Sequence, residues 1–249
     1  MYKHMTNMIL AGIALAATCF TTTAATRVFS NAAPIGIADN STATLYPSPI
    51  NVSGLTGSID SVNVTLHGFS HTWIGDLNVL LVSPAGQKIR LMQRAGSTTP
   101  TSVGFGNNFA NAEVTFSASA ASTIPGTPAV LPASGSYLPT LGLNVQNSPF
   151  PAPIGPYGSN MTSLAGSAPA QNGTWNLFVS DHAAGDVGSI ALGWTVSITG
   201  FFSCTDEGFT GAKRTLCHQV CEINYPPTTL NGLIKLWVAL YHSTPPCVD

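Results

Sequence analysis

Four segments of the chain alternate apolar and polar residues with a period of two, and this alternation constrains the fold more than any other feature. The segments are 62–66 and 77–81 in the first half of the chain and 175–179 and 192–198 in the second. Successive side chains of a strand point to opposite faces of a sheet, so such a segment buries one face and exposes the other. The pattern predicts half-buried, antiparallel β-strands.

Turn residues and a long loop-rich region separate these strands. Residues 83–86, Ser-Pro-Ala-Gly, have turn chemistry between the second strand and an apolar segment at 89–91, which indicates a hairpin-like pair. Weaker strand candidates lie at 50–52 and 114–116, and 117–170 is mostly Pro, Gly, Ser and Ala. Strands clustered early and late around a long connection predict an all-β, jelly-roll or Greek-key β-sandwich.

The N-terminus has the features of a secretory signal peptide. The basic residue Lys3 precedes an apolar run over 8–17, which gives way to small residues. Residues 1–25 are the expected signal peptide, and cleavage after Ala32 or Ala33 is the alternative. Because the run is shorter than the ~20 residues that span a bilayer, we expect a secreted protein, extracellular or periplasmic, without a membrane span.

Charged residues are scarce throughout the chain. Asp, Glu, Lys and Arg make up 7% of the residues, and the formal net charge is -2. Such a chain has no basic field that would attract nucleic acid or an anionic membrane surface. We therefore expect no nucleic-acid partner.

The character of the sequence changes after residue 200. Apolar residues between 230 and 241 recur at helical spacing, and Thr228 or Thr229 is expected to cap the start of this helix of roughly four turns. We therefore expect a sandwich over 33–200 and a Cys-rich helical tail over 201–249.

The tail contains Cys204, Cys217, Cys221 and Cys247. An even number of cysteines in an exported protein predicts disulfides. Cys217 and Cys221 are four residues apart, so on a helix they share a face and each bonds elsewhere. Two pairings remain open, Cys204–Cys217 with Cys221–Cys247 or Cys204–Cys221 with Cys217–Cys247. A zinc site whose ligands are Cys217, Cys221, His218 and His242 is the alternative, although the spacing matches no familiar zinc finger.

Three segments form a combined pattern that is more specific than any of its parts. They are Ile37–Asn40, then His71–Leu77 continuing to Ser83–Gly86, and then Asn172–Trp175 leading through Asp181 and Gly185–Gly188 to Trp194. In order and spacing, the pattern resembles the P (Homo B) domain that accompanies subtilisin-like proprotein convertases. The resemblance covers about residues 33–200.

The resemblance implies a β-sandwich that packs beside a subtilisin-like catalytic domain and helps it to fold. The chain has neither the Gly-Thr-Ser segment nor the His-Gly-Thr segment of a subtilase, so no catalytic residues are expected. The leading hypothesis is a secreted, non-catalytic binding or accessory module whose partner is a separate subtilisin-like protease or another surface protein. The alternative is that the chain belongs to a protease system as a serine-type endopeptidase.

Asp76, Asp181 and Asp186 stand at strand ends or in Gly-containing loops of this charge-poor chain. Carboxylate and carbonyl oxygens are the ligands of Ca²⁺, and modules of bacterial proteases that resemble the P domain are similar in carrying calcium. The three residues are therefore candidate calcium ligands. The alternative is that they accept hydrogen bonds from loop amides without a metal, and Asp39 is a weaker candidate because Asp-Asn pairs are ordinary turn formers.

A catalytic triad is not expected from the nearby serines and histidines. His71 and His182 have Ser70 and Ser180 close in sequence. However, adjacent residues on a strand point to opposite faces, and a nucleophile needs its base within hydrogen-bond reach.

Trp73 lies in a predicted loop and is a candidate binding aromatic, because an exposed indole can stack on a sugar ring. The alternative is that it packs over the end of the sandwich, whereas Trp175 and Trp194 fall on the apolar phase of their strands and are expected in the core. Carbohydrate or surface adhesion is thus a further candidate function. The other residues that support adhesion are the loop aromatics Tyr137, Phe150 and Tyr157.

Overall fold

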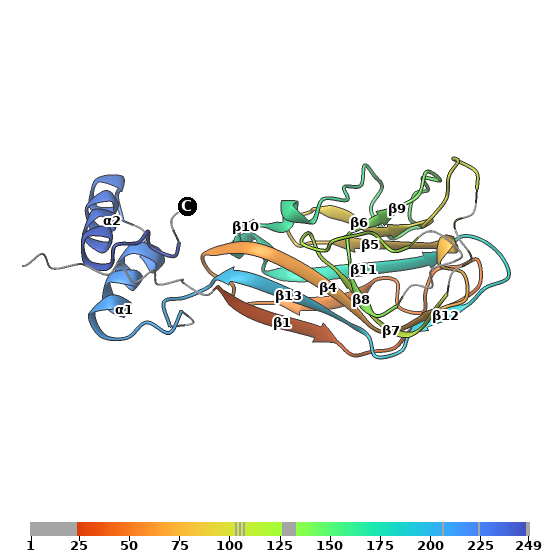
Figure 1. The fold of residues 1–249 in the computed structure, drawn as a ribbon, viewed down its shortest axis with the longest axis horizontal. Coiled ribbons are helices and arrows are strands. Elements are labelled where there is room, and N and C mark those ends of the chain that lie inside the picture. Colours follow the sequence, from red (N-terminus) through yellow and green to blue (C-terminus); the bar gives the residue numbers. More distant parts are fainter. Residues whose placement is uncertain are drawn as a thin grey trace, which may run out of the picture.

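The computed structural model describes residues 24–102, 104, 106, 108–125, 133–205, 207–223 and 225–247. The expected signal peptide lies outside the described residues except for Ala24 and Ala25. Two β-sheets pack face to face, and a small helical unit extends from one end of them (Figure 1).

The first sheet has the strand order β1–β13–β4–β12–β2, with β7 and β10 also paired to β4 and β8 paired to β7. Its strands are β1 (Ala25–Asn31), β2 (Ile35–Ile37), β4 (Ser58–His71), β7 (Phe109–Phe116), β8 (Gly135–Tyr137), β10 (Gly166–Ser167), β12 (Gly188–Ile190) and β13 (Trp194–Phe201). The long strand β4 is the centre of this sheet, because β7, β10, β12 and β13 all pair with it.

The second sheet has the order β3–β11–β5–β6–β9. Its strands are β3 (Ser48–Val52), β5 (Leu77–Val82), β6 (Lys88–Gln93), β9 (Thr140–Leu141) and β11 (Gly173–Asp181). The chain passes repeatedly between the sheets, from β4 to β5, from β6 to β7 and from β11 to β12. The predicted all-β sandwich with distant strands paired is therefore confirmed.

The core between the sheets contains the inward residues of the alternating segments. Trp175 and Trp194 are fully buried, as their strand phase predicts. Each indole N–H has an acceptor, since Trp175 donates to the Gln171 carbonyl at 3.0 Å and Trp194 donates to the Ser48 hydroxyl at 3.0 Å. The two indoles therefore pack between the sheets, and neither leaves a buried N–H without an acceptor.

Several elements differ from the expected boundaries. The sheet starts before residue 33, because β1 pairs with β13 along its whole length. The final strand begins at Trp194, and Leu192 is exposed in the preceding turn. The loop-rich region also contains β8 to β10 and the 3-10 turns η2 (Met161–Leu164) and η3 (Ala168–Gln171).

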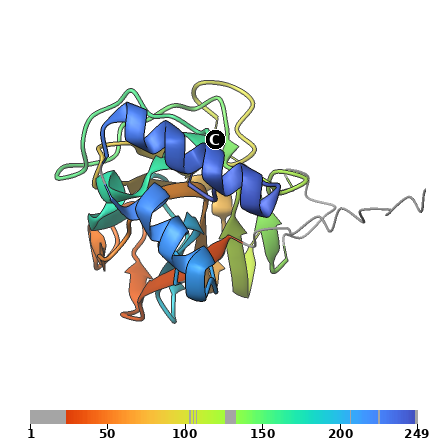
Figure 2. The same cartoon turned by 90° about the vertical axis from the view of Figure 1, so that its left-hand side faces the viewer.

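The tail contains two helices joined by a π-helical turn. These elements are α1 (Gly211–Cys217), η4 (His218–Glu222) and α2 (Pro227–Tyr241), and Figure 2 shows the two helices crossing in front of the sandwich. The expected threonine cap on α2 is wrong, because the helix begins earlier, at Pro227, and no side chain caps it. Proline suits the first helical position, where its missing N–H costs nothing. None of the described helices has the length and apolar character needed to cross a bilayer.

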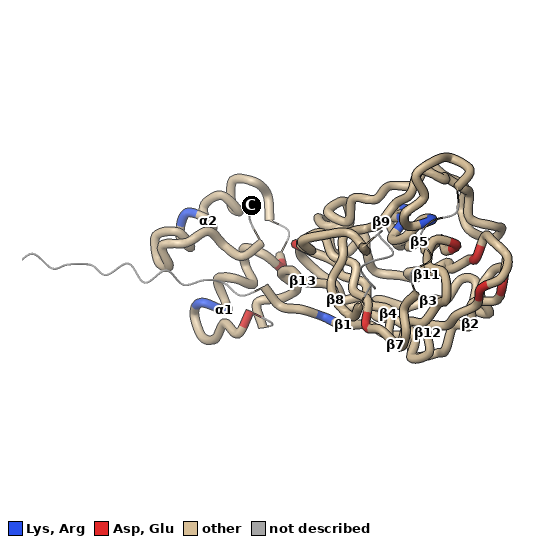
Figure 3. Tube along the Cα trace, turned by 45° about the vertical axis from the view of Figure 1, so that its right-hand side comes forward, with Lys and Arg blue, Asp and Glu red and all other residues tan. Residues whose placement is uncertain are grey.

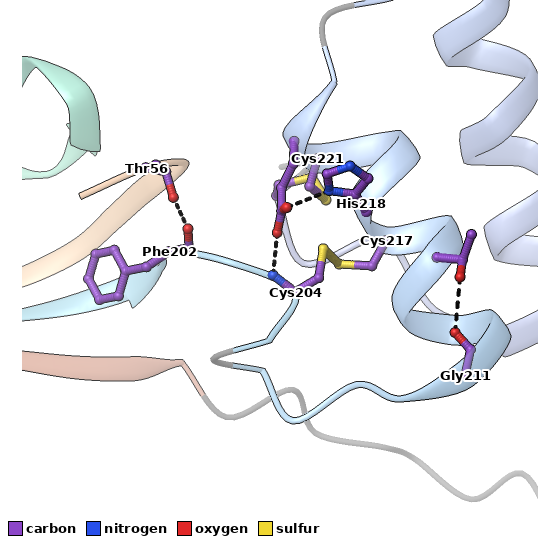
Figure 4. The surroundings of a disulfide bond; sticks show 10 residues. Thr56, Phe202, Cys204, Gly211, Cys217, His218 and Cys221 are labelled. Carbon is purple, nitrogen blue, oxygen red and sulfur yellow. Dashed lines mark hydrogen bonds and ion pairs between the residues drawn. A yellow bond between two sulfur atoms is a disulfide. The ribbon is translucent and has the colours of Figure 1, made fainter. Parts of the chain in front are cut away.

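The tail has the first of the two disulfide pairings, Cys204–Cys217 and Cys221–Cys247, with Cα–Cα distances of 5.8 and 5.6 Å (Figure 4). These bonds leave none of the four sulfurs as a thiolate for the alternative zinc site. Around them lies a small separate core centred on Trp237, which also includes Phe201 at the end of β13.

Candidate functional site

A cluster of buried polar side chains occupies the end of the sandwich where β4 and β11 finish. His71 is the last residue of β4, Asp76 lies in the 3-10 turn η1 (Ile74–Asp76), and Asp181 is the last residue of β11. The antiparallel pairing of β11 with β5 sets Asp181 opposite Leu77, next to Asp76. Arg94 follows β6 at the same end.

Arg94 is the basic residue of the cluster. Its Nη1 lies 3.7 Å from Asp76 Oδ1 and donates to the Asp76 carbonyl oxygen at 3.5 Å. Both side chains are almost fully buried, so water screens their attraction much less than on the surface. This contact joins the turn η1 to the end of β6.

His71 and Asp181 form the second contact of the cluster. His71 Nε2 lies 3.1 Å from Asp181 Oδ2, and both side chains are fully buried. The backbone N–H of Trp73 donates to His71 Nδ1 at 3.1 Å. The Trp73 carbonyl oxygen lies 3.0 Å from the same ring nitrogen, so both backbone groups of Trp73 contact His71.

Burial displaces the pKa values of two groups in opposite directions. Burial raises the pKa of Asp76 to about 6, with the nearby Asp181 adding to the rise and Arg94 opposing it. Burial, followed by Arg94 and Arg90, lowers the pKa of His182 to about 4. The cluster therefore combines a carboxyl that resists ionisation with an imidazole that resists protonation.

The three candidate calcium ligands do not all lie in the buried polar cluster. Asp76 and Asp181 share the cluster, whereas Asp186 lies in the following loop and is half-buried. Asp181 Oδ1 and Asp39 Oδ1 accept loop N–H bonds, from Ala183 and Gly185 respectively, both at 2.9 Å. In the part of the chain that the structure describes, no three His, Cys, Asp or Glu side chains are placed to hold a metal ion.

The serines near the histidines do not complete a triad. Ser180 Oγ lies 2.8 Å from His182 Nε2, but Ser180 is buried and no described carboxylate lies within ion-pair distance of that imidazole. Ser70 Oγ instead accepts the backbone N–H of Asn111 at 2.8 Å. A nucleophile needs both an oriented base and access to substrate.

Trp73 is only partly exposed. Its indole N–H donates to the Gly104 carbonyl at 3.2 Å, and its ring packs so closely on Gly106 that a Cβ there would clash with it. Of the other loop aromatics, Tyr137 is buried, Tyr157 stacks against Arg90, and Phe150 is 93% exposed.

Arg94, Asn78 and His182 were not among the residues that sequence reasoning proposed for the site. Asn78 Nδ2 lies 3.1 Å from His182 Nε2. Arg94 has φ 43° and directly follows an apolar strand. A basic residue at the end of a buried strand in so charge-poor a chain is the signal that could have found it.

Residues 59–121 match the family model described as the proprotein convertase P-domain. No curated protein matches the chain. A crystal structure of the serine protease of Aeromonas sobria is similar at 14% identity and a TM-score of 0.30, over 71% of this chain and 26% of that chain. A complex of the Aeromonas sobria serine protease and the chaperone gives 14% identity and a TM-score of 0.29, over 72% of this chain and 26% of that chain.

The chain thus spans about a quarter of the length of these solved relatives. The family match runs from β4 through η1, β5 and β6 to β7, and so contains His71, Asp76 and Arg94 of the buried cluster. Over residues 59–121 the chain is similar to the proprotein convertase P-domain.

Proposed function

We propose that the protein is an exported, non-catalytic accessory module that associates with a separately encoded subtilisin-like protease. The match of residues 59–121 to the proprotein convertase P-domain carries this proposal. In that family the module is an accessory to a catalytic domain, and the chain has no Gly-Thr-Ser segment to supply a subtilase nucleophile.

The test is capture of a protease by the full exported chain. The chain is immobilised and exposed to the secretome of its source, with the same chain irreversibly unfolded as the control. We expect a subtilisin-like protease to be retained on the folded chain only. We also expect the melting temperature of the chain to be higher in the purified complex than for the chain alone. An inert monomer that retains no protease would overturn the proposal.

Absence of catalysis is tested separately. The purified chain is incubated with casein, and we expect no hydrolysis. Hydrolysis that a serine-protease inhibitor abolishes, and that is lost on substitution of one serine, would show that the chain is itself a peptidase.

We also propose that calcium stabilises the end of the sandwich around Asp76 and Asp181. Asp76 Oδ1, Asp181 Oδ2 and Asn78 Oδ1 are buried oxygens without a hydrogen-bond donor, and such oxygens are suitable ligands for a hard cation. Because the described side chains do not supply three acidic ligands, backbone or amide oxygens would have to complete the coordination.

Calcium binding predicts a melting temperature that rises with calcium at ~10⁻⁴ to 10⁻³ M, the range of extracellular modules, and falls on chelation. Asp181→Asn should abolish the response. The control is Asp60→Asn, an exposed acid near the opposite end of β4, which should retain it. A melting temperature that ignores calcium in the unchanged chain would exclude the site.

A further inference from the structure

At the β9 edge of the second sheet, part of a long uncharged stretch of the chain has exposed apolar side chains. Residues 114–180 contain no Asp, Glu, Lys, Arg or His. Around β9 and the loop that follows it, Leu141, Val145 and Ile154 are exposed, Val145 by 71% and Ile154 by 74%. Apolar groups gathered on a monomer surface are typical of binding sites.

These side chains surround an open hollow of about 540 Å³, a volume within the range of peptide and small-ligand sites. Leu141, Val145 and Ile154 line it together with Gln93, Tyr157 and Arg90 of β6. In Figure 3, basic residues lie beside β5 and β9, and acidic residues lie both beside β5 and towards β2. The hollow therefore combines an apolar rim with a basic floor that consists of Arg90.

Arg90 is the charged residue of this floor, and it is 1% exposed. Its guanidinium lies over the ring of Tyr157 at 4.2 Å, Nη1 donates to Ser148 Oγ at 2.8 Å, and Nη2 donates to the Gln146 carbonyl at 3.0 Å. The buried Nε of Arg90 has no hydrogen-bond partner among the described residues.

No described carboxylate lies within ion-pair distance of Arg90, in contrast to Arg94, which has Asp76. A buried charge is costly unless an opposite charge pairs with it. Guanidinium groups match carboxylates through paired N–H donors. An anion supplied from outside would thus complete the floor of the hollow.

We propose that this hollow binds an apolar peptide that carries a carboxylate, with the carboxylate at Arg90 and aliphatic side chains on the rim of Leu141, Val145 and Ile154. Charge complementarity selects the ligand, since the uncharged segment and basic floor offer no acidic side chain that would repel it. Gln93, whose Nε2 donates to the Gly142 carbonyl at 3.3 Å, lines the hollow beside Arg90. The site concerns this chain alone and does not depend on the proposed protease partner.

The experiment titrates the full exported chain with N-acetyl-Leu-Val-Leu as the free acid, with the same peptide as its C-terminal amide, and with acetate. Binding is followed by calorimetry and by the methyl NMR signals of Leu141, Val145 and Ile154. We expect the acid to bind at least ~10-fold more tightly than the amide, which corresponds to about 1.4 kcal/mol. Only the peptides should shift the rim methyl signals.

Val145→Asp places a negative charge on the rim and should abolish binding of the acid peptide. The matched control is Val28→Asp, on an exposed position of β1 in the other sheet, which should bind as the unchanged chain does. Equal affinity for acid and amide, or equal affinity for acetate and the acid peptide, would overturn the proposal. A loss of binding in both variants would do the same.

Discussion

At the scale of single residues, Asp76 and His182 predict opposite effects of pH on stability. Asp76 has a folded pKa of about 6 against an ordinary value of 3.8, so the folded chain holds a proton that the unfolded chain lacks between these values. Stability from this group is therefore lost as pH rises through about 6, by about 3 kcal/mol. His182, with its pKa lowered from 6.5 to about 4, contributes stability above pH 6.5 that is lost as pH falls through about 4.

The two effects have similar size and opposite sign, so the contribution of this pair changes little between pH 4 and 6.5. In the Asp76→Asn variant the free energy of unfolding should rise with pH in this window. In the His182→Gln variant it should fall. The measurement is the free energy of unfolding in urea at each pH, with a chelator present. His242→Gln, an exposed tail histidine, is the control, and equal slopes in all four proteins would contradict the prediction.

Gly188 supports the same cluster through its lack of a side chain. It pairs with His71 on β4 and with Ile37 on β2, and an added Cβ would meet the Ser70 carbonyl oxygen and the His71 ring. Gly188→Ala should therefore destabilise the sandwich by ~1–3 kcal/mol, as overpacking does. Thermal unfolding checks this, and an unchanged melting temperature would show that the strands move apart at little cost.

At the scale of elements, α2 contains a glycine that the structure does not require. Gly232 lies inside the helix, and a Cβ there would meet nothing within 4 Å. Alanine loses less backbone freedom on folding than glycine does, so Gly232→Ala should stabilise α2 by about 0.5–1 kcal/mol. Hydrogen exchange of the α2 amides should slow by about two- to five-fold, and faster exchange would contradict the prediction.

The sequence pattern predicts the longer strands of the sandwich but not all of its elements. The alternating segments became β4, β5, β11 and β13, because a two-residue period is a local property of the sequence. Strands β4 and β13 bury alternate residues as predicted, whereas β5 and most of β11 are buried on both faces. Strand β1 was missed, since its inward positions include Arg27 and Asn31 rather than an apolar row. The shortest strands, such as β9 and β10, exist only because a partner strand lies beside them.

The candidate site was foreseeable only in part for a similar reason. The sequence indicated Asp76 and Asp181 as candidate ligands because acidic residues are rare in the chain. In the structure, the pairing of β5 with β11 brings the two residues together. Arg90 lies within β6, where a basic residue ordinarily suggests an exposed face. Its burial follows from loop residues up to Tyr157 that fold over it, and no local pattern encodes that contact.

At the scale of the whole molecule, the helical tail and the buried polar cluster occupy opposite ends of the sandwich. Phe201 leads into the tail and pairs with Ser58 at the start of β4, whereas His71 of the cluster ends the same strand (Figure 1). Changes at the cluster should therefore leave the tail unaffected. Opening the tail should in turn leave the cluster unaffected.

The tail has its own core around Trp237, and the disulfides compensate for the small size of that core. Cys221 and Cys247 are 26 residues apart, and removal of such a cross-link costs roughly 2–4 kcal/mol. Cys221→Ser with Cys247→Ser should therefore accelerate hydrogen exchange in α2 but not in β11. Because Phe201 belongs both to β13 and to the tail core, exchange at the end of β13 should rise by an intermediate amount. Equal acceleration in α2 and β11 would instead mean that the two parts unfold as one unit.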